Sequence, residues 1–440
     1  MATSSFLLPC YTLLKLFYFL LLIEKISLVS VRGLTGEYDL IDVESLMPSS
    51  SCSVPHNGTS PYKLKLVDRY GPCSPLGHQN NLSLVEQYDL IMQQDQSRVD
   101  YIHHLAAANT SSFNPLDARV PTNEGRSLGS NNFIVTIGLG TPPKFFSVEI
   151  DTGSDLTWIQ CKPCDLCHKQ KDPIYDPHES STFRSISCFS VYCSQLKRHS
   201  CNWWTFFDCL YELQYGDDSI TQGSLVKDTL RLSFDVIHNF HFGCGHLNRG
   251  IFGMEDGLLG LGRGSVSIIS QAPQFYGKVF SYCLPSKPTI DGYLAQGSSA
   301  TGIKLPPNEF GFLATVLDSG SVITKLLPIT YSALRSTFRK HMAKYRTAPS
   351  WKGLDTCYDL TNYQNVNVPT IELIFDSNVI INIGISGRLF RYKKSQMCLP
   401  FVAITNENDP VVIGNLQERT YNVVHDMENN QIGFGANGCS

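Results

Sequence analysis

The sequence predicts an all-β protein of two similar lobes, and three observations support this fold class. Short β-like runs punctuated by glycine and proline dominate the chain from Asn131 onward, as is typical of β-barrels. A tight turn that carries an aspartate occurs twice, once in each half of this region. A glycine-containing apolar motif follows each turn in the same order. Such a duplication indicates two lobes that each contribute half of one site.

The two aspartate turns have nearly the same sequence. Residues 151–154 are Asp-Thr-Gly-Ser and residues 318–321 are Asp-Ser-Gly-Ser, each after an apolar run (145–150 and 312–317). A single Asp-Thr-Gly is weak evidence for a catalytic site, because an aspartate before glycine most often belongs to an ordinary turn. Two copies after two β-like runs predict that the carboxylates lie together.

The apolar motifs after the turns extend the repeat. Residues 257–262 contain Gly260 after two leucines, and residues 411–415 contain Gly414 after Val-Val-Ile. A glycine there lets another segment approach the backbone closely. Two unrelated glycine-containing strands are the alternative, but their order matches in both halves.

Two adjacent carboxylates suit the hydrolysis of peptide bonds. Both cannot ionise cheaply, so the pair shares one proton and titrates as a unit. The ionised group takes a proton from a bridging water, and the protonated group donates to the substrate carbonyl. This chemistry works best in acid and needs no covalent intermediate. We therefore assign Asp151 and Asp318 as catalytic and expect no cofactor and no metal.

Composition and charge argue against some other classes of function and indicate the compartment. The chain has 440 residues and a net charge of −4, which is ample for two domains and gives no sign of a nucleic-acid partner. Fifteen cysteines indicate an oxidising compartment with disulfides. The Cys-x-x-Cys-x-x-Cys-His run at 161–168 is also compatible with zinc, but disulfides are the better interpretation in an exported chain.

The N-terminal part differs from the rest. The apolar segment 13–23, interrupted by Lys15, and the patch 26–31 have the length of a signal peptide and are short for a membrane span. We predict a signal peptide over 1–31, with an uncleaved anchor as the alternative. After its cleavage we expect no membrane association.

Residues 32–126 have the composition of a removable propeptide. Alternation over 62–67 predicts a strand, and apolar residues three or four apart over 83–105 predict a helix. Three glycosylation sequons begin at Asn57, Asn81 and Asn109.

The predicted propeptide strand is basic. Lys63, Lys65 and Arg69 suggest the hypothesis that this strand places a cation at the ionised aspartates and keeps the site closed. A solvated basic strand is the alternative.

Together these motifs resemble the pepsin-like aspartic peptidases, specifically their atypical plant branch, the nepenthesin-like enzymes. The resemblance implies two β-barrel-like lobes facing each other across a cleft, which we assign to 127–288 and 289–440. The second lobe is predicted to be shortened, because few residues separate Leu294 from Asp318. The stretches that carry the resemblance are 70–75, 95–99, 138–143, 151–164, 257–264, 280–284, 355–358 and 437–439.

The resemblance also implies roles for supporting residues. Thr152 and Ser319 match hydroxyls that cross-link the two active-site loops, and Ser154 and Ser321 match hydroxyls that bond an aspartate. Trp158 matches an indole that donates to the tyrosine of a mobile flap; alone, it would be interpreted as a core residue. The other predicted site residues are Gly153 and Gly320 in the turns and Tyr215, Gly216 and Asp217 in the flap.

The resemblance implies a disulfide pairing that the sequence alone cannot select. It leaves Cys10, Cys52 and Cys73 without assigned partners. The implied pairs are Cys161–Cys164, Cys167–Cys244, Cys188–Cys209, Cys193–Cys201, Cys283–Cys439 and Cys357–Cys398.

The combined prediction is a secreted aspartic endopeptidase made as a zymogen. We expect a monomer whose partners are protein or peptide substrates, with its own propeptide as an intramolecular inhibitor. The chain shows no helical insert like that of typical plant vacuolar enzymes, which favours the apoplast over the vacuole. The alternative is a catalytically weak family member that acts as a binding or inhibitor protein.

Overall fold

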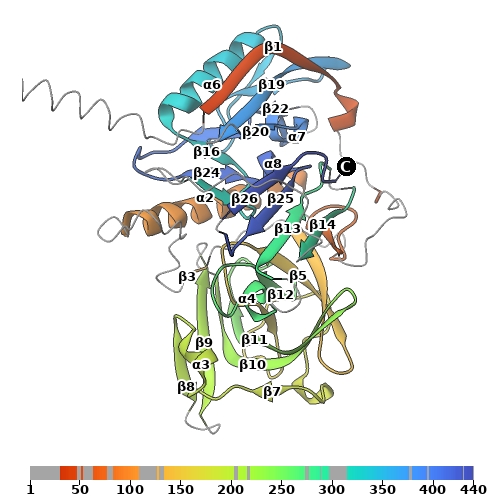
Figure 1. The fold of residues 1–440 in the computed structure, drawn as a ribbon. Helices are drawn as coiled ribbons and strands as arrows, with labels where there is room; N and C mark the ends of the chain where they lie inside the picture. Colours follow the sequence, from red (N-terminus) through yellow and green to blue (C-terminus); the bar gives the residue numbers. More distant parts are fainter. Residues whose placement is uncertain are drawn as a thin grey trace, which may run out of the picture.

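The computed structural model describes most of the chain, and structural statements below refer to these residues. Strands dominate and gather into two lobes, one above the other in Figure 1. The described ranges are 30–46, 51–52, 63–76, 83–108, 126–127, 133–202, 207–215, 219–272, 277–287, 289–296, 315–375, 379–393, 396–429 and 431–439.

The N-terminal segment precedes both lobes and contributes to each of them. Its elements are β1 (Ser30–Asp42), η1 (Glu44–Leu46), β2 (Lys63–Asp68), α2 (Leu84–Ala108) and β3 (Arg126–Ser127).

The N-terminal lobe follows. Its elements are β4 (Phe133–Leu139), β5 (Lys144–Asp151), β6 (Trp158–Gln160), η2 (Pro177–Glu179), β7 (Arg184–Ser185), α3 (Val191–Ser194), β8 (His199–Asn202), β9 (Asp208–Tyr215), β10 (Ile220–Leu232), β11 (Asp235–Arg249), β12 (Gly257–Gly260), α4 (Ile268–Gln271) and β13 (Val279–Cys283).

The C-terminal lobe completes the chain. Its elements are β14 (Gly292–Gln296), β15 (Thr315–Asp318), β16 (Thr324–Leu326), α6 (Pro328–His341), β17 (Thr347–Ala348), β18 (Cys357–Asp359), β19 (Asn365–Phe375), β20 (Val379–Asn382), α7 (Ile385–Arg388), β21 (Phe390–Arg391), β22 (Gln396–Cys398), β23 (Phe401–Ala403), β24 (Val411–Gly414), α8 (Asn415–Glu418), β25 (Asn422–Asp426) and β26 (Gln431–Gly435).

The same four-strand arrangement holds the aspartate in each lobe. The strand order is β5-β12-β6-β11 in the first lobe and β15-β24-β16-β23 in the second. In both, the outer pairs are parallel and the middle pair is antiparallel. Asp151 pairs in register with Gly260, and Asp318 with Gly414. The repeat predicted from sequence is confirmed.

The two repeat glycines are needed because the backbone of another segment passes close by. A Cβ on Gly260 would lie 2.3 Å from the carbonyl oxygen of Asp155, and one on Gly414 would lie 2.6 Å from that of Val322. Any side chain would push these segments apart. The crossing segments are those that follow each aspartate turn, so each glycine fixes its own aspartate loop.

The large sheet of the N-terminal lobe extends through the predicted propeptide strand to strands of the C-terminal lobe. Strand β2 pairs with β14 on one side and with β4 on the other. Strands β13, β25 and β26 continue the sheet beyond β14. The strand predicted over 62–67 is therefore confirmed, and it joins segments from both lobes.

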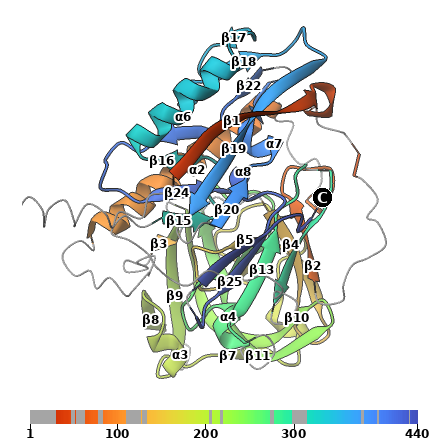
Figure 2. The same ribbon diagram turned by 45° about the horizontal axis from the view of Figure 1, so that its top comes forward.

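The predicted helix of the N-terminal segment is also confirmed and lies between the lobes (Figures 1 and 2). Helix α2 begins with a capping box: Ser83 Oγ accepts from the Glu86 amide at 3.3 Å, and Glu86 Oε2 accepts from the Ser83 amide at 2.7 Å. This reciprocal pair fixes the start of the helix.

The sequence analysis missed strand β1, which extends a sheet of the C-terminal lobe. Strand β1 pairs antiparallel with β19, whose other edge pairs with β20; it is the red strand beside α6 in Figure 1. Residues 297–314, where we predicted the lobe to be shortened, lie outside the described ranges. Strand β1 covers one sheet edge, and an uncovered edge is prone to aggregation.

A buried arginine anchors β1 to the C-terminal lobe. The guanidinium of Arg388 binds the Asp39 carboxylate of β1 and the carbonyl oxygen of Pro369, the latter at 3.0 Å. The Arg388 side chain is 4% exposed, whereas that of Asp39 is 50% exposed. Asp39 therefore supplies part of the charge compensation that a buried guanidinium requires.

Four of the six predicted disulfides are wrong, and Cys283–Cys439 and Cys357–Cys398 are confirmed. The first error, at Cys161–Cys164 and Cys167–Cys244, arises because β6 runs alongside β11. The Cys161 amide donates to Gly245 at 3.0 Å, which places Cys161 beside Cys244. The disulfides in this region are Cys161–Cys244 and Cys164–Cys167.

The second error concerns Cys188–Cys209 and Cys193–Cys201. Cys193 on α3 is buried in the same apolar cluster as Cys209, so these two residues bond. Cys188 then bonds Cys201. The spacing of the cysteines along the chain contains no information about this packing.

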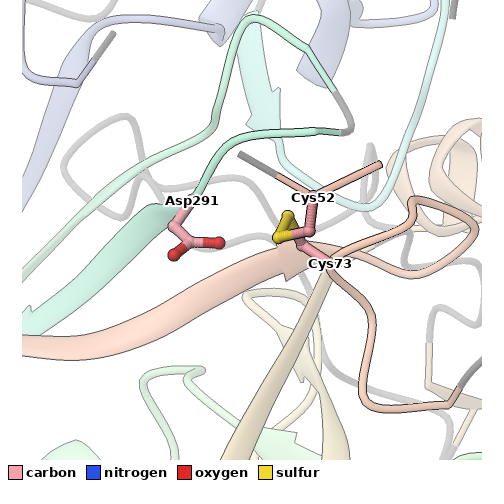
Figure 3. A group of neighbouring side chains, drawn as sticks. All are labelled: Cys52, Cys73 and Asp291. Carbon is pink, nitrogen blue, oxygen red and sulfur yellow. A yellow bond between two sulfur atoms is a disulfide. The ribbon is translucent and has the colours of Figure 1, made fainter. Parts of the chain in front are cut away.

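A further disulfide, Cys52–Cys73, joins two cysteines that the resemblance left without partners. Figure 3 shows this bond with the Asp291 carboxylate beside it. Sulfur atoms shared in a disulfide are not thiolate ligands, so this group is not a metal site. The same reason excludes zinc at 161–168, because its three cysteines are in disulfides.

Several predictions for the N-terminal part concern residues outside the described ranges. These are residues 1–29 of the predicted signal peptide and the sequon asparagines Asn57, Asn81 and Asn109. In the described part of the chain, no helix has both the length and the apolar character needed to span a membrane.

The anchoring of β1 predicts a selective effect on stability. Replacing Asp39 with alanine should lower the free energy of unfolding by about 1–2 kcal/mol, because it removes a half-exposed partner of the buried Arg388. Denaturant unfolding of the unprocessed chain at neutral pH measures this. Leu40→Ala, at a neighbouring residue that is 70% exposed, is the control and should change stability by less than about 0.5 kcal/mol. Equal effects of the two substitutions would contradict the anchoring role.

Candidate active site

The structure brings the two predicted catalytic aspartates together at the ends of β5 and β15. Both Asp151 and Asp318 are buried. The loops that carry them are cross-linked through Thr152 Oγ1 and Ser319 Oγ, which lie 3.2 Å apart. Because this contact joins equivalent residues of the two lobes, it fixes the carboxylates relative to each other.

The turn residues hold the carboxylates, with one exception. The amide of Gly153 donates to Asp151 Oδ1 at 2.9 Å, and that of Gly320 donates to Asp318 Oδ1 at 3.2 Å. Ser321 Oγ donates to Asp318 Oδ2 at 2.5 Å, as predicted.

Ser154 does not have the contact that we predicted for it. Its Oγ is buried and makes no hydrogen bond to any residue that the structure describes. The two serines of the repeat therefore differ. Ser321 orients its aspartate, whereas Ser154 lies where the segment after β12 crosses the aspartate loop, and its carbonyl oxygen accepts from the Gly262 amide at 2.8 Å.

The predicted tryptophan and flap tyrosine are in contact. Trp158 Nε1 donates to the hydroxyl of Tyr215, and both side chains are buried. Phe252 packs edge-on against both rings, with centroid distances of 5.2 and 6.0 Å. Burial, and secondarily the charge of Asp151, raises the pKa of Tyr215 well above its ordinary value. The predicted flap residues Gly216 and Asp217 lie outside the described ranges.

Helix α2 places an arginine directly on the two aspartates. Arg98 Nε donates to Asp318 Oδ2 at 2.6 Å, and a terminal nitrogen contacts Asp318 Oδ1 as well. The same nitrogen lies 3.3 Å from Asp151 Oδ1. A Cβ on Gly320 would lie 2.1 Å from Arg98 Cζ, so this turn glycine makes room for the guanidinium.

The ion pairs outweigh the cost of burial. Burial disfavours the charge on Arg98, but Asp318 and Asp151 together raise its pKa above the ordinary value. Burial likewise opposes ionisation of Asp318, but Arg98 and the Ser321 hydroxyl hold its pKa below the usual range. In this state Asp318 accepts hydrogen bonds from Arg98. Because Arg98 contacts both carboxylates, a water molecule cannot bridge them as a nucleophile.

Other contacts hold α2 to both lobes. Asp95 accepts from the amides of Val322 and Ile323, and its Oδ2 lies 2.7 Å from Lys325 Nζ. Gln94 reaches the N-terminal lobe, where it donates to the carbonyl oxygen of Ile251 at 3.1 Å. The helix therefore bridges the two lobes and is anchored to each of them.

The hypothesis that the basic strand supplies the cation at the dyad is wrong. Lys65 Nζ lies 2.9 Å from Asp291 Oδ2, and Lys63 Nζ lies 3.5 Å from the ring centroid of Tyr293. Arg69 binds two glutamates instead of the dyad. A strand inside a sheet has its side chains directed by the pleat, and β2 directs its lysines toward the neighbouring strand β14.

The sequence contained a signal for Arg98 that we did not use. Ile91, Asp95, Arg98 and Ile102 recur at spacings of four and three, so they share one face of the helix. All four are buried. Two charged residues within the apolar face of a helix indicate partners on the surface that it covers.

Sequence reasoning also missed a buried glutamate next to the dyad. Tyr282 donates to Glu418 Oε2 at 2.8 Å. Burial, together with the charge of Asp318, raises the pKa of Glu418 to about 8. Glu418 is therefore neutral in acid and adds no second negative charge beside Asp318.

The contact between Arg98 and the dyad predicts a pH-dependent stability. Asp318 has a lower pKa in the folded chain than when unfolded, so the pair stabilises the fold above the unfolded pKa of about 3.9. That contribution is lost as the pH falls through the lowered pKa. Arg98→Gln should therefore cost about 3 kcal/mol near pH 7 and progressively less below about pH 4. Denaturant unfolding across this range measures the difference.

The matched control is Arg198→Gln, which removes an exposed ion pair with Glu212. It should cost less than about 1 kcal/mol. A cost of Arg98→Gln that stays constant or grows toward low pH would contradict the pairing with an ionised Asp318.

Family models match nearly all of the two lobes. They are described as Xylanase inhibitor N-terminal, over residues 133–298, and Xylanase inhibitor C-terminal, over residues 299–436. Among solved structures, conglutin gamma from lupine seeds has a TM-score of 0.55 at 17% identity and covers 71% of this chain and 93% of its own. Basic 7S globulin from soybean has a TM-score of 0.54 at 17% identity and covers 70% of this chain and 94% of its own. These structures support the bilobal fold.

Sequence relatives extend over the N-terminal segment as well. An aspartyl protease family protein of Arabidopsis thaliana is 37% identical over 91% of this chain and 93% of its own length. Aspartyl protease AED1 of the same plant is 36% identical over 91% of this chain and 92% of its own length. Nepenthesin-2 of Nepenthes gracilis, an aspartic proteinase, is 30% identical over 71% of this chain and 78% of its own length. With the paired aspartates and the duplicated strands, these matches show that the chain belongs to the plant family of pepsin-like aspartic proteases.

Proposed function

We propose that this chain is the zymogen of a secreted aspartic endopeptidase that hydrolyses protein or peptide substrates at acidic pH. One observation carries the proposal: two buried aspartates end equivalent strands of a duplicated arrangement, and the Thr152–Ser319 contact joins their loops. Family relatives with protease names support it.

The mechanism follows from the geometry of the two carboxylates once Arg98 has left. With no cation between them, Asp151 and Asp318 cannot both ionise cheaply, so they share a proton. The ionised member deprotonates a bridging water, which attacks the substrate carbonyl carbon. The protonated member donates to the carbonyl oxygen, and the roles reverse as the amine leaves. Neutral Glu418 leaves the shared charge of the pair at minus one.

The propeptide is proposed as the inhibitor of its own protease. Arg98 occupies the position of the water, and α2 fills the cleft that a substrate would enter. In acid, protonation of the dyad weakens the ion pairs that hold this helix. We keep the division into a signal peptide (1–31), a propeptide (32–126) and two lobes (127–288 and 289–440), with secretion to the apoplast and a monomeric mature enzyme.

A second candidate function is a binding or inhibitor protein with weak catalysis. The matching family models are described by xylanase inhibition, which favours this alternative. Activity separates the two functions, because a binding protein needs neither aspartate.

Cleavage of a protein substrate tests the proposed function directly. After acid treatment, the purified chain should digest a denatured protein substrate, and a transition-state analogue should inhibit it. Asp151→Ala or Asp318→Ala should lower kcat by at least about 10² to 10⁴, because each removes a general acid–base group. Release of peptides quantified by mass spectrometry is the measurement. Cleavage that survives either substitution would contradict the mechanism, and no inhibitable cleavage at any acid pH would favour the binding protein.

The pH of activation tests the proposed inhibitory role of Arg98. Arg98→Gln should process itself and cleave substrate at a higher pH than the unmodified chain, because the dyad then binds no propeptide cation. The control is the double substitution Lys63→Gln and Lys65→Gln, in the same propeptide but away from the dyad. It should leave the activation pH unchanged. The pH of half-maximal conversion, followed by gel electrophoresis, decides between them; equal midpoints for all three chains would contradict the role of Arg98.

A further inference from the structure

A second propeptide arginine fills a pocket beside the dyad. Arg69 follows β2 and enters a cavity whose walls include Glu149, Trp158, Tyr215 and Glu255. The space left beside it is ≈ 20 Å³, room for about one water molecule. The guanidinium therefore nearly fills this pocket.

Two carboxylates bind the guanidinium from different strands. Arg69 forms an ion pair with Glu149 on β5, and its other terminal nitrogen lies 2.8 Å from Glu255 Oε2, just before β12. The three side chains are between 3% and 9% exposed. A Cβ on Gly253 would lie 1.9 Å from this second nitrogen, so Gly253 leaves room for the guanidinium.

The pocket adjoins the catalytic centre. Glu149 and Asp151 are two residues apart on β5, and alternate residues of a strand project from the same face. Its lining also includes the hydrogen-bonded pair of Trp158 and Tyr215, in which Tyr215 is the predicted flap tyrosine. A substrate residue in this pocket therefore lies close to the bond that the dyad attacks.

Apart from Arg69 and Gln94, the residues that line the pocket belong to the N-terminal lobe, so its walls stay with that lobe when the propeptide is removed, whereas the cation does not. Glu149 and Glu255 belong to the N-terminal lobe, whereas Arg69 belongs to the segment that is removed. The Gly253 amide donates to Glu255 Oε1 at 2.7 Å and keeps that carboxylate oriented. Removal of Arg69 takes away the cation that binds both buried carboxylates in this structure, and buried charge is tolerable only when it is well paired. A basic side chain of a substrate would restore this positive charge, and an apolar side chain would not.

We propose that the pocket of Glu149 and Glu255 selects substrates with a basic residue, arginine before lysine, next to the scissile bond. Arginine is preferred because its planar fork can bind two separate carboxylates at once. This inference rests on the proposed function. Arg69 is then an occupant of the substrate pocket, in the same propeptide whose Arg98 occupies the dyad.

The test uses the acid-activated enzyme and peptides that differ only beside the scissile bond. At one fixed acidic pH at which the enzyme is active, peptides with arginine, lysine, citrulline or leucine are compared by kcat/KM. Citrulline has the shape of arginine without its charge. Arginine should exceed citrulline and leucine at least about 100-fold, with lysine between them.

A matched variant tests the residues. Glu149→Gln with Glu255→Gln, made together with Arg69→Gln so that no buried cation is left unpaired, should lose the arginine preference while still cleaving the leucine peptide. Arg69→Gln alone should keep the preference. The control Glu179→Gln, at an exposed ion pair with Lys144, should also keep it.

A binding measurement separates failure of this inference from failure of the proposed function. Calorimetry with uncleavable transition-state analogues, which carry arginine or leucine at the same position, should show tighter binding of the arginine form, and the triple variant should lose this difference. Leucine preferred over arginine in either assay, or a preference that survives in the triple variant, would overturn the pocket assignment. Arginine-selective binding without cleavage would retain the pocket and reject the protease.

Discussion

The contact of Arg98 with Asp318 and Asp151 is the interaction on which the closed form depends. A guanidinium and two carboxylates are removed from water together, and such burial is tolerable only when the charges are well paired. The turn glycine Gly320 gives the guanidinium its space, and Asp95 and Gln94 hold the helix on both sides. The residues that would perform catalysis are thus the same ones that bind Arg98. Under the proposed function, latency and activity correspond to two charge states of one site.

The duplicated core was predictable because its signals are local. Apolar runs, aspartate turns and the glycines Gly260 and Gly414 each report a backbone requirement that a sequence displays directly. Helix α2 was predictable from its periodicity for the same reason. The site's supporting contacts, Thr152 with Ser319 and Trp158 with Tyr215, followed from the family resemblance, and the structure places each pair in contact.

What was not predictable depends on packing between distant segments. Strand β1 has no strong pattern of its own, since Tyr38 and Leu40 are exposed, and its partner β19 lies far along the chain. The disulfides of Cys161 and Cys193 follow from which strand and helix pack beside them. Assigning the cation to the basic strand failed because net charge in a segment does not say where one side chain points. Arg98 was identifiable only as a charge on an apolar helix face.

The Cys52–Cys73 disulfide has a consequence for how the propeptide departs. It links the stretch after β1 to the stretch after β2, so a single cut in residues 53–72 leaves the two pieces covalently joined. Strand β1 on the C-terminal lobe and strand β2 between the lobes then stay one body, and each holds the other at high local concentration. Under the proposed function, one such cut would not free either strand to diffuse away by itself. Release would then depend on the detachment of both strands, which favours a sharper threshold than two separate pieces would give.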